Sequence, residues 1–303
     1  MSGLIEIIPN FSVSEQVDAA AFQALKQTAE AARGCTLLNI HSDGDHNRCV
    51  FTVVGSADSI GEAAFALCKT ASEVIDLTKH KGRHPRMGAT DVLPFVPLSG
   101  ASMEECAALA KKTAQRVWEE LGIPSFLYEE AALREEHRNL ADCRRGEFEG
   151  MSEKLLLPEW APDFGERRVH PTAGITAIGA RLPLIAFNVN LDTDDVQLAK
   201  DIAKAVRGSS GGFPYCKALG ILLDGRNIAQ VSMNFVNHER TPIFPVFEEI
   251  RRLAALRGVG ILSSELVGMT PARALTDCAA AYLKLENFSC SEQVLECRLF
   301  YME

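Results

Sequence analysis

The hydrophobic residues of this 303-residue chain follow two kinds of pattern, and together these predict an alternation of strands and helices. Short apolar runs of four to eight residues are typical of buried strands, and longer segments with apolar positions three or four apart are typical of helices. The first half is predicted to contain strands at 4–8, 35–40, 48–54, 91–97 and 124–129, and helices at 14–32, 57–78 and 102–121. Ser102 and Glu105 form a capping-box pattern where the last of these helices begins.

The second half repeats this order of elements. It is predicted to contain strands at 184–191, 217–223, 228–236 and 260–266, and helices at 193–206, 242–257 and 271–285. Each half therefore opens β-α-β-β-α-β, which is the order of the split βαβ, ferredoxin-like unit. The fold class predicted from the sequence is α+β, with two ferredoxin-like (βαββαβ-type) subdomains.

The segment 139–181 separates the two halves and is poor in regular pattern. Its stretch PEWAPDFGERRVHPTAGITAIGAR carries three prolines and three glycines. A loop of this length in a compact domain is usually functional or disordered, and its aromatic and apolar residues argue against disorder. We place the boundary near Arg181, which gives subdomains at 1–180 and 181–303. Two sheets joined in this way are expected to leave a crevice between them for substrates.

Composition and charge exclude several classes of protein. The formal net charge of −9 argues against a general nucleic-acid binder, because no basic stripe or lysine-rich tail is present. No run of eighteen apolar residues occurs, and the N-terminus has no basic segment before its short apolar run. We therefore expect a cytoplasmic protein that does not act in a membrane. The nine cysteines are scattered without a C-x-x-C pair, which indicates reduced residues in the core.

The motifs of metal and phosphate sites are absent or incomplete. His80 and His84 have the spacing of two zinc ligands on one helix, but Gly82 and Pro85 oppose a helix there, and no third ligand is placed nearby. The stretch from Asp43 resembles the start of a calcium loop, yet its sixth position is Arg48 rather than glycine. Neither a P-loop nor a G-x-S-x-G elbow occurs. The sequence predicts no metal site.

The stretch HKGRHPRMGATD, residues 80–91, carries the strongest candidate chemistry. His84 lies in a loop directly before a buried strand, and Pro85 restricts the backbone beside it. Arg83 and Arg86 would lower the pKa of His84 by like charge, and a nearby acid would restore it. An imidazole that titrates near neutral pH can pass a proton in both directions. A loop histidine without a catalytic role stays the alternative at this point.

Five stretches together resemble one enzyme family, glutamate formimidoyltransferase, along essentially the whole chain. These are IIPNFS (7–12), DHNR (45–48), HKGRHPRMGATDVLPFVP (80–97), WAPDFG (160–165) and LIAFNVNL (184–191). The family is the formiminotransferase half of an enzyme that animals fuse to a cyclodeaminase. The resemblance implies transfer of a formimino group from N-formimino-L-glutamate to N5 of tetrahydrofolate, which gives 5-formiminotetrahydrofolate and L-glutamate.

The resemblance also implies particular residues. The catalytic histidine of the H-P-R-M-G motif maps onto His84, which would act as general base and then as general acid. The folate-binding stretch follows D-F-G and maps onto Gly165, Glu166, Arg167, Arg168, Val169, His170, Pro171, Thr172, Ala173 and Gly174. Tetrahydrofolate is expected as co-substrate, with no metal. Both substrates carry carboxylates, which suits the arginines of these loops.

Weaker candidates for substrate contacts lie at strand ends and beside the histidine. They are Asn10, His41, Arg86, Asn188 and Asn190. His41 departs from the family pattern, because the animal members carry an acid at this position. If that acid orients the catalytic histidine, Asp43 or Asp45 would have to do so here.

Further expectations follow from the resemblance, and rival functions stay open beside it. The family tends to form homodimers, and a chain without the cyclodeaminase would need a separate cyclodeaminase downstream. One rival function is transfer of a formyl group between 5-formyltetrahydrofolate and glutamate. Two others, from different classes, are a folate-binding protein without catalysis and an interaction protein with an unused crevice.

Overall fold

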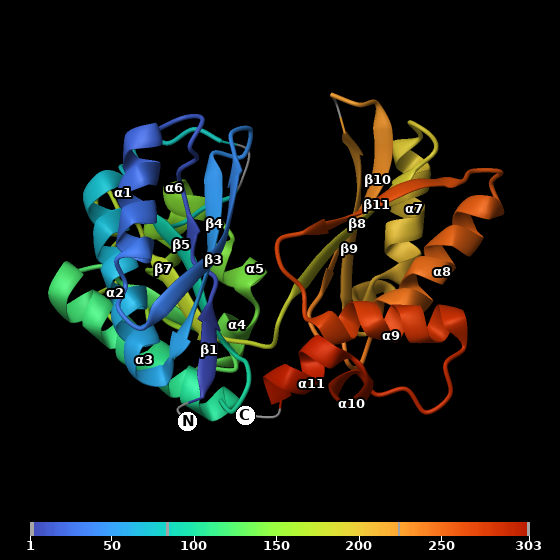
Figure 1. The fold of residues 1–303 in the computed structure, drawn as a ribbon. Helices are drawn as coiled ribbons and strands as arrows, with labels where there is room; N and C mark the ends of the chain where they lie inside the picture. Colours follow the sequence, from blue (N-terminus) through green and yellow to red (C-terminus); the bar gives the residue numbers. More distant parts are fainter. Residues whose placement is uncertain (1–2, 83–84, 224, 302–303) are drawn as a thin grey trace. The chain divides into compact units, whose positions relative to one another are not determined.

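The computed structural model describes residues 3–82, 85–223 and 225–301, without the side chains of residues 300 and 301. The chain has mixed α and β structure with two sheets, and it divides into two compact units, Met1–Arg181 and Leu182–Glu303 (Figure 1). These are called the N-terminal and C-terminal units below. The α+β class predicted from the sequence is confirmed.

The N-terminal unit is built on a seven-stranded sheet. Its strands are β1 (Leu4–Ile7), β2 (Asn10–Phe11), β3 (Cys35–Asp43), β4 (Arg48–Ser56), β5 (Thr90–Pro97), β6 (Ser125–Glu129) and β7 (Thr176–Ala180). Both β1 and β2 lie between β4 and β5. The chain is interrupted between β1 and β2 at Pro9, because the proline nitrogen has no hydrogen to donate to a neighbouring strand. β7 runs parallel to β5 and to β6 and joins them, whereas the other pairs are antiparallel.

Three helices pack on one face of this sheet: α1 (Ala19–Glu30), α2 (Ala57–Val74) and α3 (Met103–Leu121) (Figure 1). Each buries one apolar stripe on the sheet, as periodicity predicts. The capping box predicted at Ser102 and Glu105 is confirmed. α1 begins later than predicted, because the side chain of Asp18 caps it by accepting from the amide of Ala21.

On the other face of the sheet, short helices of the same unit cover the β5–β7–β6 side. There α5 (Leu140–Arg144) and α6 (Glu147–Lys154) contribute to a second apolar cluster with strand residues such as Val92 and Phe126. The short helix α4 (Glu135–Arg138) places the His137 ring 4.7 Å from that of Phe126. The sequence prediction that 139–181 lacks regular structure is wrong. The segment contains α5, α6, a short 3-10 helix (η1, Pro158–Trp160) and the central strand β7. Strand β7 reads TAIGA, and its small residues give little of the β-branched signal on which strand prediction depends.

The C-terminal unit has a four-stranded antiparallel sheet in the order β11-β8-β10-β9. The strands are β8 (Ile185–Leu191), β9 (Cys216–Leu223), β10 (Ile228–Phe235) and β11 (Ile261–Val267). Helices α7 (Val196–Val206) and α8 (Ile243–Ala255) pack with one face of the sheet in a single apolar core. A short 3-10 helix (η2, Gly208–Ser210) follows α7, and the chain continues through α9 (Ala272–Leu283), α10 (Cys290–Gln293) and α11 (Leu295–Tyr301).

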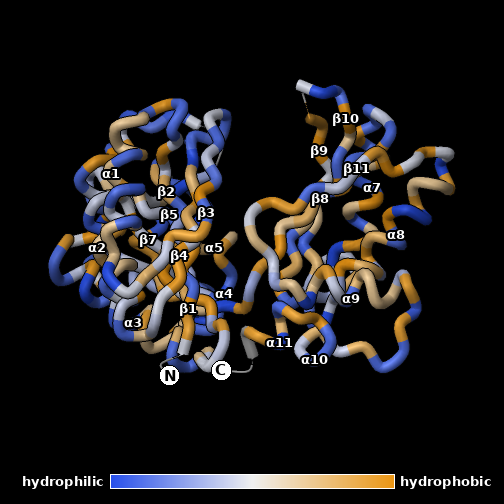
Figure 2. Tube along the Cα trace, in the orientation of Figure 1, coloured by the Kyte–Doolittle hydropathy of each residue, from blue (hydrophilic) through white to orange (hydrophobic). Residues whose placement is uncertain are grey.

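The hydropathy of the chain follows these layers. Figure 2 shows apolar residues concentrated along β4 and hydrophilic residues in many of the connecting loops. Among the residues that the structure describes, no helix is both long and apolar enough to cross a membrane.

Candidate active site

Four of the motif stretches meet at one end of the N-terminal sheet. Strand pairing places Asp43 opposite Arg48 and places Phe11 opposite both Cys49 and Thr90. The motifs around these residues therefore lie side by side at the ends of β2, β4 and β5. The fourth motif, D-F-G, reaches the same end through a bridge between Phe164 and Ser125, the first residue of β6.

Ser12 of the N-F-S motif and the nearby Ser14 connect the neighbouring loops. The hydroxyl of Ser12 donates to the carbonyl of Gly88 at 2.7 Å, and its amide donates to the carbonyl of Ala89 at 3.0 Å. The amide of Ser14 donates to Asn47 Oδ1 at 3.0 Å. Asn47, which adopts a left-handed φ of 47°, donates from Nδ2 to the carbonyl of Lys81 at 2.9 Å. The N-F-S stretch, the turn at Asn47 and the segment 81–89 are thus joined by hydrogen bonds to backbone groups.

His80 is fully engaged by protein groups. Arg86 Nε donates to its Nδ1 at 3.0 Å, so Nδ1 is the acceptor and Nε2 carries the ring hydrogen. Nε2 then donates to the carbonyl of Asn47 at 2.9 Å. Burial lowers the pKa of His80 from its usual 6.5. The hydrogen bond to Asn47 raises this pKa in part, and the charge of Arg86 lowers it again. The His80 ring is held neutral in a single tautomer.

Arg86 is 7% exposed and lies between two carboxylates. Its Nη1 and Nη2 donate to the two oxygens of Glu149 at 2.8 and 2.5 Å, and Nη1 also donates to Glu147 at 3.3 Å. The backbone carbonyl of Arg86 accepts from the amide of Phe148 at 2.8 Å. Hydrogen bonds to Glu149 raise the pKa of Arg86 and lower that of Glu149. All three nitrogens of this guanidinium donate to protein groups.

The predicted catalytic residue, His84, lies outside the described residues, as does Arg83. The structure describes the chain on both sides of them. Gly82 packs so closely on the His46–Asn47 turn that a Cβ would lie 2.4 Å from the carbonyl oxygen of His46. The described chain just before position 83 is therefore held against this turn.

Asp91 anchors the end of the H-P-R-M-G-A-T-D stretch. Its side chain is 2% exposed, and Oδ1 accepts from the amide of Met87 at 2.9 Å. Oδ2 pairs with Arg144 Nη2 of α5 at 2.7 Å. One buried carboxylate therefore holds both the loop backbone and the helical segment that covers it.

The predicted folate-binding stretch, 165–174, is hydrogen-bonded directly to the H-P-R-M-G motif. Ala89 donates to the carbonyl of Ala173 at 2.9 Å, and the amide of Ile175 donates to the carbonyl of Met87 at 3.0 Å. Gly174 lies so close that a Cβ would sit 2.1 Å from the carbonyl oxygen of Met87, and its φ of 74° suits glycine. The two stretches singled out from the sequence form one continuous piece of structure.

Asp163 of the D-F-G motif holds the near end of that stretch. Its Oδ2 accepts from the amide of Leu127 at 2.8 Å and lies 2.7 Å from His137 Nδ1. His137 is completely buried, and its Nε2 lies 3.1 Å from the carbonyl of Glu159. Gly165 follows with a φ of 113°, where a Cβ would lie 2.8 Å from Pro124. The aspartate and the glycine fix where the stretch leaves the sheet.

The stretch itself presents charge to its surroundings. Glu166, Arg167 and Arg168 are exposed, and Arg168 Nε pairs with Glu166 at 2.8 Å. Arg168 also lines a hollow of about 280 Å³, together with Leu121, Gly122, Val169, His170 and Pro171. Burial and the Arg168 charge lower the pKa of His170, whose Nδ1 accepts from the amide of Ala173 at 3.0 Å. Exposed guanidinium groups of this kind are suited to binding carboxylates.

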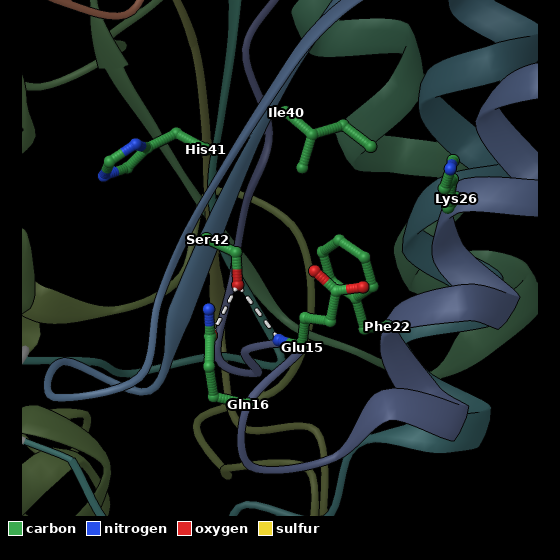
Figure 3. A pocket seen from close by; sticks show the side chains of 7 residues that line it. All are labelled: Glu15, Gln16, Phe22, Lys26, Ile40, His41 and Ser42. Atoms are coloured by element: carbon green, nitrogen blue, oxygen red, sulfur yellow. Dashed lines mark hydrogen bonds between the residues drawn. The ribbon is translucent and has the colours of Figure 1, made fainter.

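Asn10 and His41 lie on one row of the N-terminal sheet, because Val50 pairs with both of them. Residues paired in this way point to the same face, opposite the face that carries α1 to α3. In Figure 3, His41 points away from Ile40 and Phe22, which belong to the helix side. A hollow of about 440 Å³ lies at this part of the sheet, and it is lined by Glu15, Gln16, Phe22, Lys26, Ile40, His41 and Ser42 (Figure 3).

Asn188 and Asn190 lie on β8 of the C-terminal unit, on the face opposite its helices. Asn190 is completely buried and donates from Nδ2 to Ser263 and Glu265 at 2.9 and 3.1 Å. Its Oδ1 accepts from Gln230 Nε2 at 2.8 Å. Asn188 is half-buried two residues away, and pairing places it between Ser232 and Glu265. This face carries a row of amide and hydroxyl groups.

Sequence reasoning missed the partners supplied by α5 and α6. Glu147 and Glu149 bind Arg86 from more than sixty residues away, and Arg144 binds Asp91 from more than fifty. The only available signal was the dense mixture of charges in RRGEFEG. It also missed Glu6 on β1, whose pKa is raised by burial and lowered in part by Arg181. Among the described residues, no group of three or more histidine, cysteine or acidic side chains is placed to hold a metal ion.

Comparison with known proteins gives the same assignment along the chain. The family described as "Formiminotransferase domain, N-terminal subdomain" matches residues 4–181, and "Formiminotransferase domain" matches residues 186–300. A glutamate formimidoyltransferase of Streptococcus pyogenes is 54% identical over 98% of both chains, and one of Thermoplasma acidophilum is 42% identical over 94% of both. Formimidoyltransferase-cyclodeaminase of Mus musculus is 42% identical over 99% of this chain and 56% of its own length. The chain therefore belongs to the formiminotransferase family.

Proposed function

We propose that this chain is a glutamate formimidoyltransferase, which moves the formimino group of N-formimino-L-glutamate to N5 of tetrahydrofolate. Relatives that carry this name match it over nearly their full length at 54% and 42% identity. The structural observation that carries the proposal is the hydrogen-bonded contact between the H-P-R-M-G motif and the folate-binding stretch, from Met87 to Ile175 and from Ala89 to Ala173. A histidine-bearing loop and a cofactor-binding loop joined in this way can deliver both reactants to one place.

The reaction needs proton transfer at two nitrogens. N5 of tetrahydrofolate attacks the formamidine carbon, and a tetrahedral intermediate forms with new positive charge on N5. N5 must then lose its proton, and the departing nitrogen of glutamate must gain one before its bond to carbon breaks. A single imidazole can do both, as general base and then as general acid. We assign this role to His84.

The environments of other histidines near the motifs support that assignment. His80 and His137 have both ring nitrogens in contact with protein groups, and His137 is fully buried. His170 uses Nδ1 to accept from its own turn. None of these three has two ring positions available to a substrate. His41 is exposed on β3 and stays a candidate for a substrate contact, together with Asn10 on the same row.

Carboxylate recognition accounts for the remaining predicted residues. Arg167 and Arg168 are exposed on the folate-binding stretch, where they can pair with the glutamate tail of tetrahydrofolate. Asn188 of the C-terminal unit lies in a row of polar side chains that can donate to N-formimino-L-glutamate. The cation of the amidine intermediate would be stabilised by a carboxylate, and Glu6 is a candidate on the same sheet as the motif loops.

The strand order supports a finer description of the fold. In the C-terminal unit, four strands and two helices follow as βαββαβ with the antiparallel order β11-β8-β10-β9, which is that of a ferredoxin-like unit. The N-terminal sheet has the same core, β3-β4-β1/β2-β5, extended by the parallel strands β7 and β6. The subdomains at 1–180 and 181–303, and a substrate crevice between them, stay predictions, as do a homodimer and a cytoplasmic location.

A single assay tests the proposal. Purified protein is incubated with N-formimino-L-glutamate and tetrahydrofolate, the mixture is acidified, and the absorbance of methenyltetrahydrofolate is read. Wild-type protein should give a signal that needs both substrates, and His84→Ala should give none while its circular dichroism spectrum is unchanged. His238→Ala, which removes a half-buried histidine of the C-terminal unit, is the control and should keep the activity.

The outcomes separate the rival functions. Full activity in His84→Ala contradicts the assigned role of this residue. No signal from wild-type protein that still binds folate in a calorimeter indicates a folate-binding protein without catalysis. Formyl transfer is measured by supplying 5-formyltetrahydrofolate and L-glutamate, and turnover of only this pair would replace the proposed reaction.

A further inference from the structure

The segment that carries the proposed catalytic histidine is closed by a hydrogen bond between side chains. Arg86 Nε donates to His80 Nδ1 at 3.0 Å, which joins two residues six positions apart on either side of 81–85. Gly82 and Pro85, the described residues next to positions 83 and 84, both lie inside this closed segment. The hydrogen bond therefore fixes His80 and Arg86 relative to each other.

Each end of the hydrogen bond is fixed by other parts of the N-terminal unit. His80 Nε2 donates to the carbonyl of Asn47, whose side chain donates to the carbonyl of Lys81. On the other side, Glu149 accepts two hydrogen bonds from the Arg86 guanidinium at 2.8 and 2.5 Å. Bidentate pairing fixes the plane of an arginine, and it aims Nε at the imidazole. The chain of contacts therefore runs from α6 through Arg86 and His80 to the turn before β4.

We propose that His80 and Arg86 form a clamp, oriented by Glu149, that holds the described residues on either side of positions 83 and 84 in place for the transfer reaction, and that neither residue binds substrate. This inference rests on the proposed function and on the assignment of His84. It gives Arg86 a different role from the substrate contact predicted by sequence. The clamp acts through the loop, so its loss should lower kcat and leave substrate affinity nearly intact.

Burial and charge give the clamp a direction of response to pH. The groups that act on His80 are Arg86, Glu149 and Asp91, and together with burial they leave its pKa below 6.5. A protonated Nδ1 cannot accept from Arg86, so acid opens the clamp. The clamp is complete above about pH 6.5 and is lost as the pH falls through the lowered pKa of His80.

The test compares His80→Ala with His80→Asn. Asparagine can place Oδ1 near the position of Nδ1 and so keep an acceptor for Arg86, whereas alanine removes it. We expect His80→Ala to lower kcat by about 10- to 100-fold, because a displacement of about 1 Å in a catalytic group has effects of that size. KM for each substrate should change less than about threefold. His80→Asn should recover most of kcat, and the acid limb of its kcat profile should lie at lower pH than in wild-type protein.

Arginine variants supply a matched control. Arg86→Lys removes the bidentate geometry, and we expect kcat to fall about tenfold. Arg116→Lys makes the same change in an arginine that pairs with Glu62 and Glu120 between α2 and α3, and it should leave kcat unchanged. Thermal unfolding is measured for all four variants. If His80→Ala does not fold, Glu149→Gln replaces it as a milder change, and kcat is again expected to fall at constant KM.

Three results would overturn the clamp. One is wild-type kcat in His80→Ala and Arg86→Lys. The second is a large rise in KM at constant kcat, which would make Arg86 a substrate ligand. The third is an equal loss of kcat in His80→Asn and His80→Ala that follows the loss of thermal stability in each variant. That result would leave His80 only a structural role. Failure of the proposed function is distinct, because it would appear as no transfer by wild-type protein or as full transfer by His84→Ala.

Discussion

The two units use polar side chains in different ways at the positions that sequence singles out. In the N-terminal unit, Ser12, Asn47 and Asp91 bond to backbone groups of loops. In the C-terminal unit, Asn190, Gln230 and Ser263 bond to one another across the face of a sheet. Loops need side chains to fix their backbone, whereas a strand is already fixed by its neighbours and can present side chains. We therefore expect changes in the first group to affect kcat and changes on the second face to affect KM.

The strongest way to break the N-terminal arrangement is Gly174→Ala. A Cβ there would lie 2.1 Å from the carbonyl oxygen of Met87, so the proposed folate-binding stretch must separate from the H-P-R-M-G motif. We expect kcat/KM for tetrahydrofolate to fall by about 100-fold or more. Gly211→Ala is the control, because Gly211 has the same left-handed backbone (φ 90°) but nothing within 4 Å of a new Cβ. Equal effects of the two variants would show that backbone strain alone is responsible.

Asp91→Asn should have the next largest effect. The amide oxygen can still accept from Met87, but Arg144 loses the charge that it pairs with at 2.7 Å, and both side chains are largely buried. We expect the free energy of unfolding to fall by about 1.5–3 kcal/mol and kcat to fall about tenfold. Urea unfolding measures the first and the transfer assay the second. Asp142→Asn removes an exposed pair with Arg145 and should cost less than about 0.5 kcal/mol; a similar loss there would contradict the argument from burial.

The C-terminal face is tested by two neighbouring asparagines. Asn188→Ala should raise KM for one substrate about tenfold with little change in kcat or stability, which corresponds to one hydrogen bond to a charged group. Asn190→Ala should instead lower stability by about 1–3 kcal/mol, because buried Gln230 loses its acceptor. If Asn188→Ala lowers kcat at constant KM, the division of roles between the units is wrong.

The smallest expected effect is on stability in mild acid. The folded-state pKa of His80 lies below its usual 6.5, so the unfolded chain binds a proton more readily than the folded one. Stability from this residue is complete above about pH 6.5 and declines as the pH falls toward the lowered value. Urea unfolding between pH 7.5 and 5 should show a shallower decline for His80→Asn than for wild-type protein. Parallel curves would contradict a neutral His80 in the folded state.

The sequence predicted most of the strands and helices, because their apolar positions follow regular periods. It did not predict β7, whose small residues TAIGA pack between two parallel strands, or α5 and α6, which are too short for periodicity to be visible. The H-P-R-M-G and D-F-G motifs were recognised as separate stretches. That Ala89 bonds to Ala173, and Arg86 to Glu149, depends on how distant segments pack, and no local pattern carries this information.

The central claim is that the H-P-R-M-G motif and the folate-binding stretch form one folate site. Hydrogen exchange with and without 5-formyltetrahydrofolate, followed by mass spectrometry, tests it most directly. The account predicts slower exchange in peptides that cover both 80–91 and 165–175, and unchanged exchange in α2 (Ala57–Val74), which packs on the helix-covered face of the sheet. Protection of α2, or of only one of the two motif stretches, would contradict the claim.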